Sequence, residues 1–180
     1  MNETEHKHIF STRILAEITI FVALATALSF IIIYQFPQGG SITLASMVPI
    51  LWLALRRGQI TGLFTGTVYG FIQFAILPFI VPGAYAPIQV LLDYPLAFGV
   101  LGLAGLFQKR PLVGVTVGIT GRFIMHFVSG VFFWAPIITP ESNPLVYSAV
   151  YNGSYLLPEL VISGFLIYLL QKRNALRAYL

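Results

Sequence analysis

The positions of the basic residues constrain this chain more than any other feature of its sequence. Nine of the ten Lys and Arg residues fall into four short clusters, and the segments between the clusters are almost entirely apolar. Because Lys and Arg beside membrane-spanning helices stay mainly on the cytoplasmic side, consecutive clusters must be separated by an even number of crossings. Two crossings in each interval predict six helices. The clusters are Lys7/Arg13, Arg56/Arg57, Lys109/Arg110 and Lys172/Arg173/Arg177.

The composition supports a membrane protein. The chain has 180 residues, of which 57% are hydrophobic and 9% are charged, whereas about 25% of the residues of a soluble domain are charged. Six spans of about 20 residues leave only short loops and tails. We therefore predict an all-α integral membrane protein: one six-helix domain over residues 1–180, embedded in lipid, with cytoplasmic tails at 1–12 and 171–180. The net charge of +4 follows from this topology and does not indicate a nucleic-acid partner.

The absence of cysteine excludes disulfides and thiolate metal sites. Metal ligation would depend on three His residues, two of which, His6 and His8, lie in the polar N-terminal tail. The sequence therefore predicts no metal and no cofactor.

The apolar segments place the boundaries of the six helices. The second segment is short and contains Pro49, so it is expected to be kinked or to span the bilayer incompletely. The predicted helices cover residues 13–34, 42–57, 59–81, 87–107, 111–134 and 145–170.

Two stripes of small residues occur at helical spacing, and such stripes allow close helix approach. The glycines at positions 58, 62, 66 and 70 are assigned to packing inside the bundle. Thr19, Ala23 and Ala27 in the first helix are the better candidate for an external face.

Polar residues inside membrane helices usually face a cavity or a partner. At a rise of 1.5 Å per residue, Asp93, His126 and Asn152 lie about 9 to 12 Å below the outer ends of three different helices. Aromatic or small residues lie at or above this layer, and we expect a pocket open to the outside. Such a pocket suits a small, planar ligand and can accommodate a positive charge on it. The surrounding residues are Tyr94, Gly130, Trp134, Tyr147 and Tyr151.

Arg122 and Glu159 lie one to two turns deeper and are expected to pair with each other, although Arg122 could instead orient Asp93. Trp134 and Tyr147 lie near the membrane interface, where an aromatic anchor is as frequent as a ligand contact. Ser129 follows His126 by three residues but lacks the glycine setting of a serine nucleophile, so no catalytic residue is assigned.

Several segments resemble the bacterial thiamine-specific substrate-binding subunits (S-components) of energy-coupling factor transporters. The similarity covers nearly the whole chain, and the fifth-helix and sixth-helix segments are the most specific. The segments are 37–41 (PQGGS), 47–50 (MVPI), 55–58 (LRRG), 91–94 (LLDY), 122–134 (RFIMHFVSGVFFW) and 147–153 (YSAVYNG).

The resemblance implies a six-helix S-component that captures thiamine from outside as a transported ligand. It also implies partners, namely a membrane coupling subunit and two cytoplasmic ATPases. The implied thiamine contacts are Asp93, Tyr94, His126, Gly130, Trp134, Tyr147 and Asn152, with Arg122, Tyr85, Tyr151 and Glu159 as further or supporting contacts.

This sequence departs from the family pattern at several positions. Asp93 and Arg122 replace a glutamate and a lysine of some members. Glycines 39 and 40 stand where some members carry a tryptophan, so that stacking is either absent or supplied by Tyr34 or Tyr85. The resemblance also implies that the coupling subunit docks on the small-residue stripe of the first helix. The family's docking stripe corresponds here to Thr19 and Ala23, with threonine in place of the usual alanine.

The residues alone leave other functions open. The chain could be an S-component for another vitamin or a pyrimidine precursor. It could be an intramembrane enzyme that uses His126 and Asp93, or a stand-alone secondary carrier in which Arg122 and Glu159 relay protons.

Overall fold

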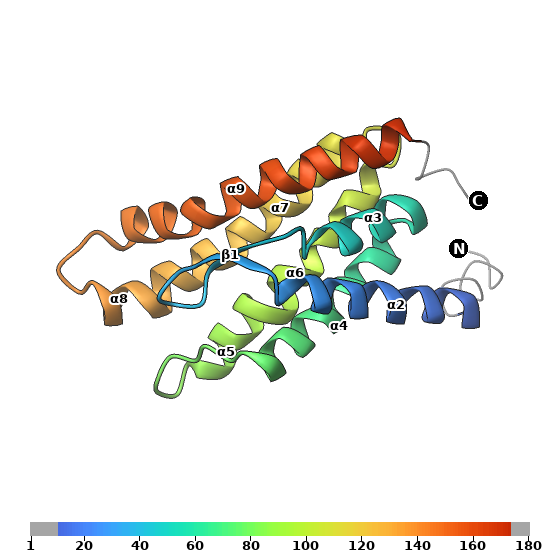
Figure 1. Ribbon diagram of the computed structural model, residues 1–180. Coiled ribbons are helices and arrows are strands. Elements are labelled where there is room, and N and C mark those ends of the chain that lie inside the picture. Colours follow the sequence, from blue (N-terminus) through green and yellow to red (C-terminus); the bar gives the residue numbers. More distant parts are fainter. Residues whose placement is uncertain (1–10, 174–180) are drawn as a thin grey trace.

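Helices run back and forth between two ends of the molecule, with one small sheet beside them (Figure 1). The computed structural model describes residues 11–173, so Lys7, Arg177 and the tail histidines lie outside the described residues. The elements are α2 (Thr12–Ser29), β1 (Ile32–Gln35), β2 (Ser41–Thr43), α3 (Val48–Arg57), α4 (Gln59–Ile76), α5 (Ala86–Leu91), η1 (Leu92–Leu96), α6 (Ala97–Gly99), η2 (Val100–Phe107), α7 (Pro111–Ser129), η3 (Gly130–Trp134), α8 (Ala135–Ile138) and α9 (Pro144–Lys172).

Four helical segments of the described chain are long and apolar enough to cross a membrane: α2, residues 86–107, residues 111–138, and α9. With α3 and α4 they confirm the predicted fold of six helical segments. However, α3 has only 10 residues and is therefore about 15 Å long, half of a hydrocarbon core of about 30 Å. The short second segment that the sequence predicted cannot cross the membrane by itself.

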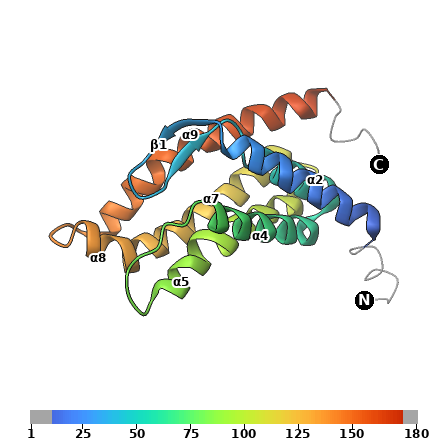
Figure 2. The same ribbon diagram turned by 60° about the horizontal axis from the view of Figure 1, so that its bottom comes forward.

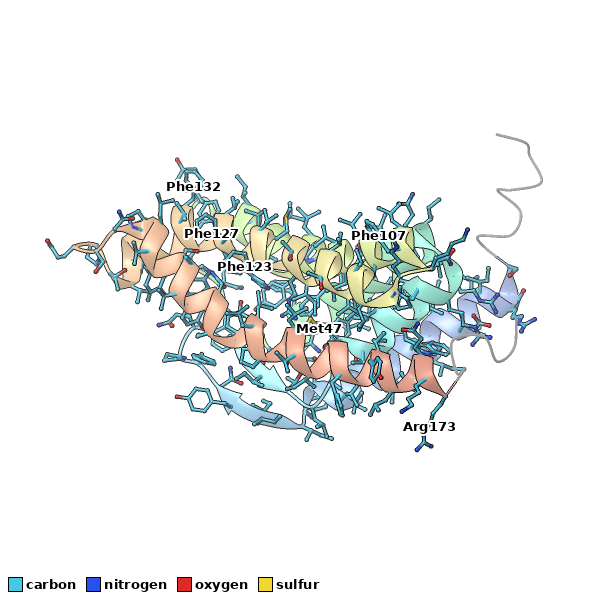
Figure 3. All side chains as sticks on the ribbon, turned by 90° about the horizontal axis from the view of Figure 1, so that it is seen from above. Met47, Phe107, Phe123, Phe127, Phe132 and Arg173 are labelled. Carbon is cyan, nitrogen blue, oxygen red and sulfur yellow. The ribbon has the colours of Figure 1, made fainter. Side chains whose placement is uncertain are left out.

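The basic clusters of the described chain gather at one end of the molecule. The start of α2 and the end of α9 lie at this end (Figure 1), and Phe107 and Arg173 lie toward it in Figure 3. Here Arg57 donates to both carboxylate oxygens of Glu17, at 2.6 and 2.7 Å, and so joins α3 to α2. The loops of the opposite end carry α8 and the start of α5 (Figure 1).

The first two predicted helices are wrong between residues 30 and 47. Here the chain leaves α2 at Ser29 and forms an antiparallel hairpin of β1 and β2, which lies beside α9 (Figure 2). Three consecutive isoleucines, residues 31–33, favour a strand over a helix. Gly39 turns the hairpin with φ +90°, a conformation that favours glycine.

The third predicted helix, 59–81, also extends too far, because α4 ends at Ile76. Leu77 precedes Pro78, and the residue before a proline is disfavoured in the helical conformation. The last two helices are longer than predicted and reach Ile138 and Lys172.

Glycines bring α4 into backbone contact with the helix of residues 86–107. A Cβ at Gly66 or Gly70 would collide with the backbone at Phe98 or Tyr94, and one at Gly62 would meet Gly102 at 2.8 Å. The prediction that the glycine stripe serves packing inside the bundle is therefore confirmed for these three positions. The fourth, Gly58, has φ +92° and forms the turn between α3 and α4.

Two π turns interrupt the helices that carry the candidate site. In η1, Pro95 lies inside the turn, and Pro136 follows two residues after η3. A proline removes one backbone donor from the helical ladder, and a π turn accommodates the resulting irregularity. These turns contain Asp93 and Tyr94 in η1, and Gly130 and Trp134 in η3.

Candidate functional site

A cavity of about 120 Å³ lies among the helices and the hairpin, toward the end opposite the basic clusters. On the scale where one water needs about 10 to 15 Å³, it holds roughly ten waters or one small organic ligand. All seven residues predicted as ligand contacts line it, as do three of the four supporting residues. These are Asp93, Tyr94, His126, Gly130, Trp134, Tyr147 and Asn152, with Arg122, Tyr151 and Glu159.

Tyr85 and Tyr34 do not line this cavity. Tyr85 is 68% exposed and its ring contacts Phe133, while Tyr34 is also exposed and packs against Phe36. The expectation that either ring replaces the missing tryptophan of the first outer loop is therefore wrong in this structure. The aromatic side chains that do line the cavity come from other segments. One of them is Phe79, in the loop after α4.

Asp93 is the centre of a hydrogen-bond network in the outer part of the cavity. Its Oδ2 accepts from Gln89 Nε2 at 2.6 Å and from the Trp134 indole at 2.9 Å. Its Oδ1 lies 3.1 Å from Nδ1 of His126. A carboxylate offers about four acceptor positions, so three are occupied and one remains for a donor from a ligand.

The contacts of His126 determine its tautomer. Nε of Arg122 donates to Nε2 of His126 at 3.2 Å, and a guanidinium can only donate. Nε2 must therefore be the accepting nitrogen, and Nδ1 carries the proton that it donates to Asp93. The imidazole is thus a neutral relay through which Arg122 orients the carboxylate, as one of the two sequence interpretations of Arg122 anticipated.

Arg122 is held by further contacts. Its NH1 lies 2.8 Å from the sulfur of Met47, which occupies the interior between the helices (Figure 3). Its guanidinium carbon lies 4.2 Å from the centre of the Phe98 ring, a cation–π arrangement.

The predicted Arg122–Glu159 ion pair is wrong. The ion pairs found within residues 11–173 join Glu17 to Arg13 and Arg57. Glu159 instead accepts from the backbone N–H and the hydroxyl of Thr43. It thereby satisfies non-helical backbone at the end of β2, which a membrane-embedded chain tolerates only where protein buries it.

Gln89 is a residue of the site that the sequence interpretation missed. It is fully buried, accepts from Val81 N at 3.2 Å and donates to Phe79 O at 3.1 Å and to Asp93. The loop after α4 thereby fixes the amide that holds Asp93. Its position four residues before Asp93, on the same helix face, could have revealed it.

Tyr94 also hydrogen-bonds to the loop after α4. Its hydroxyl accepts from Phe79 N at 2.7 Å and donates to Leu77 O at 3.0 Å. The hydroxyl is therefore engaged by backbone, and the ring is the part of Tyr94 that borders the cavity.

The buried side chain of Asn152 joins α9 to α7. Its Nδ2 donates to His126 O at 3.2 Å and to Ser148 O at 2.9 Å, and its Oδ1 accepts from Tyr155 at 2.7 Å. A Cβ at Gly130 would collide with Ser148. The structure thus brings Asp93, His126 and the Asn152 amide together, with glycine allowing the close approach of the helices.

Tyr147 offers the cavity an unused group. Its ring stacks on Tyr151, with centroids 5.9 Å apart and planes at 10°. Its hydroxyl is buried without a hydrogen-bond partner among the described residues. In contrast, the Tyr151 hydroxyl accepts from Gly40 N at 3.0 Å and holds the hairpin to α9.

Two further expectations concern the docking stripe and metals. Thr19, Ala23 and Ala27 are all exposed on α2, so they form an external face of the described chain. No group of three His, Asp or Glu within residues 11–173 is arranged to hold a metal ion.

Comparison with known proteins identifies the family. A family model described as "Thiamine transporter protein (Thia_YuaJ)" matches residues 15–178. The chain is 33% identical to the thiamine transporter ThiT of Bacillus subtilis, covering 87% of this chain and 88% of the relative. It is 28% identical to ThiT of Lacticaseibacillus paracasei, covering 83% and 80%.

A solved structure shows the same fold. ThiT from Listeria monocytogenes superposes with a TM-score of 0.76 at 29% sequence identity, covering 90% of this chain and 94% of that one. Together, the match over residues 15–178 and the similarity to these relatives show that the chain belongs to the thiamine transporter family.

Proposed function

We propose that this chain binds thiamine at the cavity described above and serves as the substrate-binding subunit of an energy-coupling factor importer. The curated relatives are named thiamine transporters, which agrees with the prediction of a non-catalytic chain. The observation that supports the ligand most directly is the arrangement around Asp93. This carboxylate is oriented by three donors and has one acceptor position left, beside the Trp134 ring.

The formal charge of the cavity suits thiamine, whose thiazolium ring carries one positive charge. Asp93, Glu159 and Arg122 line the cavity, and with neutral His126 their formal charges sum to −1. In our proposal the amino group of the pyrimidine donates to Asp93 and this ring packs on Trp134. The thiazolium then lies near His126, Tyr147 and Asn152.

The membrane orientation follows from the basic end of the bundle. By the positive-inside rule we place Arg57, Lys109 and Arg173 at the cytoplasmic face of the cell membrane, with both termini in the cytoplasm and the cavity toward the outside. Thiamine would then enter between the outer loops.

Transport would require partners. We place the coupling subunit on the exposed stripe of Thr19, Ala23 and Ala27, because small residues allow close helix contact. The sequence has no phosphate-binding loop, so ATP hydrolysis belongs to the two cytoplasmic ATPases. The stand-alone carrier depended on an Arg122–Glu159 relay, and that ion pair does not form.

The test is a thiamine titration of the purified protein, followed by tryptophan fluorescence. The chain contains two tryptophans, so a Trp52→Phe variant leaves Trp134 as the reporter beside Asp93. We expect quenching that saturates, and weaker competition by the separate pyrimidine and thiazole halves. Absence of thiamine binding would refute the proposed ligand. Uptake into vesicles by this chain alone would refute the proposed dependence on partners.

A further inference from the structure

The inner part of the cavity contains a buried acceptor that no protein group satisfies. Glu159 is 2% exposed and lines the cavity. Its Oε1 accepts two hydrogen bonds from Thr43, one of them from the hydroxyl at 2.7 Å. Its Oε2 is buried and has no hydrogen-bond partner among residues 11–173. The hydrogen bonds to Thr43 therefore satisfy only Oε1 of the two carboxylate oxygens.

The neighbouring polar groups do not satisfy this oxygen, because they bond to each other. The Thr43 hydroxyl donates to Glu159, so the Ser46 hydroxyl, 2.6 Å away, must donate to Thr43. Gln73 donates to the Ser29 hydroxyl at 3.0 Å. Buried polar atoms are almost always hydrogen-bonded, and an exception calls for a partner.

The position of Glu159 defines the length of a ligand that could reach it. Asn152 and Glu159 are seven residues apart on α9, which is two turns and about 10 Å along the same helix face. Asn152 contacts His126, which contacts Asp93. The two carboxylates thus line one cavity at different depths. An extended ligand with a donor at each end would satisfy both.

We propose that this inner end is a second polar subsite, in which Oε2 of Glu159 accepts a hydrogen bond from a hydroxyl at the far end of the ligand. This inference rests on the proposed function, and in thiamine the group is the hydroxyl of the hydroxyethyl chain. The subsite selects the free alcohol over its phosphate ester. Esterification removes the donor and places anionic oxygens beside a buried carboxylate, where repulsion is weakly screened.

Arg122 also lines the cavity and is the cation that could offset this repulsion. Its guanidinium, however, already donates to His126 and contacts the sulfur of Met47. A phosphate that recruited Arg122 would take it from His126, and so would disturb the orientation of Asp93. Both effects favour the unesterified ligand.

The experiment compares three ligands on the wild-type protein and on Glu159→Gln: thiamine, its deoxy analogue with hydrogen in place of the hydroxyl, and thiamine monophosphate. Glutamine keeps an acceptor for Thr43 but presents N–H groups in place of Oε2. We expect Glu159→Gln to weaken thiamine binding about ten- to a hundred-fold and deoxy-analogue binding less than about threefold. The preference for thiamine over the monophosphate should fall by about tenfold or more.

Two comparisons separate this role from a structural one. Thr43→Val removes a donor to Oε1 and leaves Oε2 in place, so it should affect thiamine and the deoxy analogue equally. In the wild-type protein itself, the deoxy analogue should bind about tenfold more weakly than thiamine. Equal affinities there, or equal losses of both ligands in a folded Glu159→Gln protein, would overturn the subsite. Failure of the wild-type protein to bind thiamine would instead overturn the proposed function.

Discussion

Replacing Asp93 by asparagine tests the hydrogen-bond network at the centre of the site. The two side chains have nearly the same shape, but asparagine has one acceptor oxygen and one donor nitrogen. If its oxygen faces Gln89 and Trp134, its N–H group faces the protonated Nδ1 of His126. If it rotates, its N–H group faces the Gln89 amide and the indole instead. Either orientation places donors against donors.

The contacts set the expected magnitude. A buried donor left without a partner costs about 1 to 3 kcal/mol, so the free energy of unfolding should fall by about this amount. His126 cannot relieve the clash by moving its proton to Nε2, because Arg122 Nε donates to that atom at 3.2 Å. A ligand would also lose a charge-assisted hydrogen bond of about 1.5 to 3 kcal/mol, or about ten- to 150-fold in affinity.

The assay is a calorimetric thiamine titration of wild type, Asp93→Asn and Asp93→Glu, with thermal unfolding of each protein in the absence of ligand. Asp93→Glu keeps the charge and should retain more affinity than Asp93→Asn. Wild-type affinity and unchanged stability in Asp93→Asn would refute the reasoning, because three donors then could not converge on this carboxylate.

Three further outcomes are expected. Gly66→Ala should lower the free energy of unfolding by about 1 to 3 kcal/mol, because the added methyl group collides with the neighbouring backbone. Gly164→Ala is the control, since its Cβ meets nothing within 4 Å, and it should leave the free energy of unfolding unchanged or raise it by up to about 1 kcal/mol. Thermal unfolding of both variants measures the difference. Tyr147→Phe should not destabilise the ligand-free protein, since its hydroxyl is unpartnered there, but should weaken thiamine binding about two- to tenfold in a fluorescence titration. Glu17→Gln should lower the free energy of unfolding by about 1 kcal/mol, and by less at high salt, because it weakens the ion pair with Arg57. Denaturant unfolding of the detergent-solubilised protein measures this loss. An equal loss at low and high salt would contradict an electrostatic origin.

The sequence was sufficient for the helix order and for the layer of candidate contacts. Charge clusters and apolar length report directly on membrane crossings, and helix rise places Asp93, His126 and Asn152 at similar depths. Regular spacing, however, does not reveal where a helix stops being regular. The hairpin replaced predicted helix because the isoleucines at 31–33 are as apolar as a span but prefer a strand.

The pairing partners were harder to predict. Glu159 and Arg122 have opposite charges at similar depth, yet Glu159 bonds to Thr43, which the sequence placed in a helix. Gln89 was missed because a single amide carries little signal in a pattern of charges. Hydrogen-bond partners depend on the course of the loops, and helical periodicity contains no information about that course.

The π turn η1, which contains Asp93, restricts how the helix of residues 86–107 can vary in length. A π turn already holds one residue more than an α turn, so inserting a further residue into η1 would rotate the downstream part of the helix by about 100° relative to the upstream part. Phe98 and Gly102, which meet the α4 glycines, would then swing out of alignment with Gly66 and Gly62. A gained residue would thus misalign the glycine contacts of this helix with α4, whereas loss of one residue would restore a regular α turn. Aligned relatives should accordingly pass through residues 89–102 without an insertion.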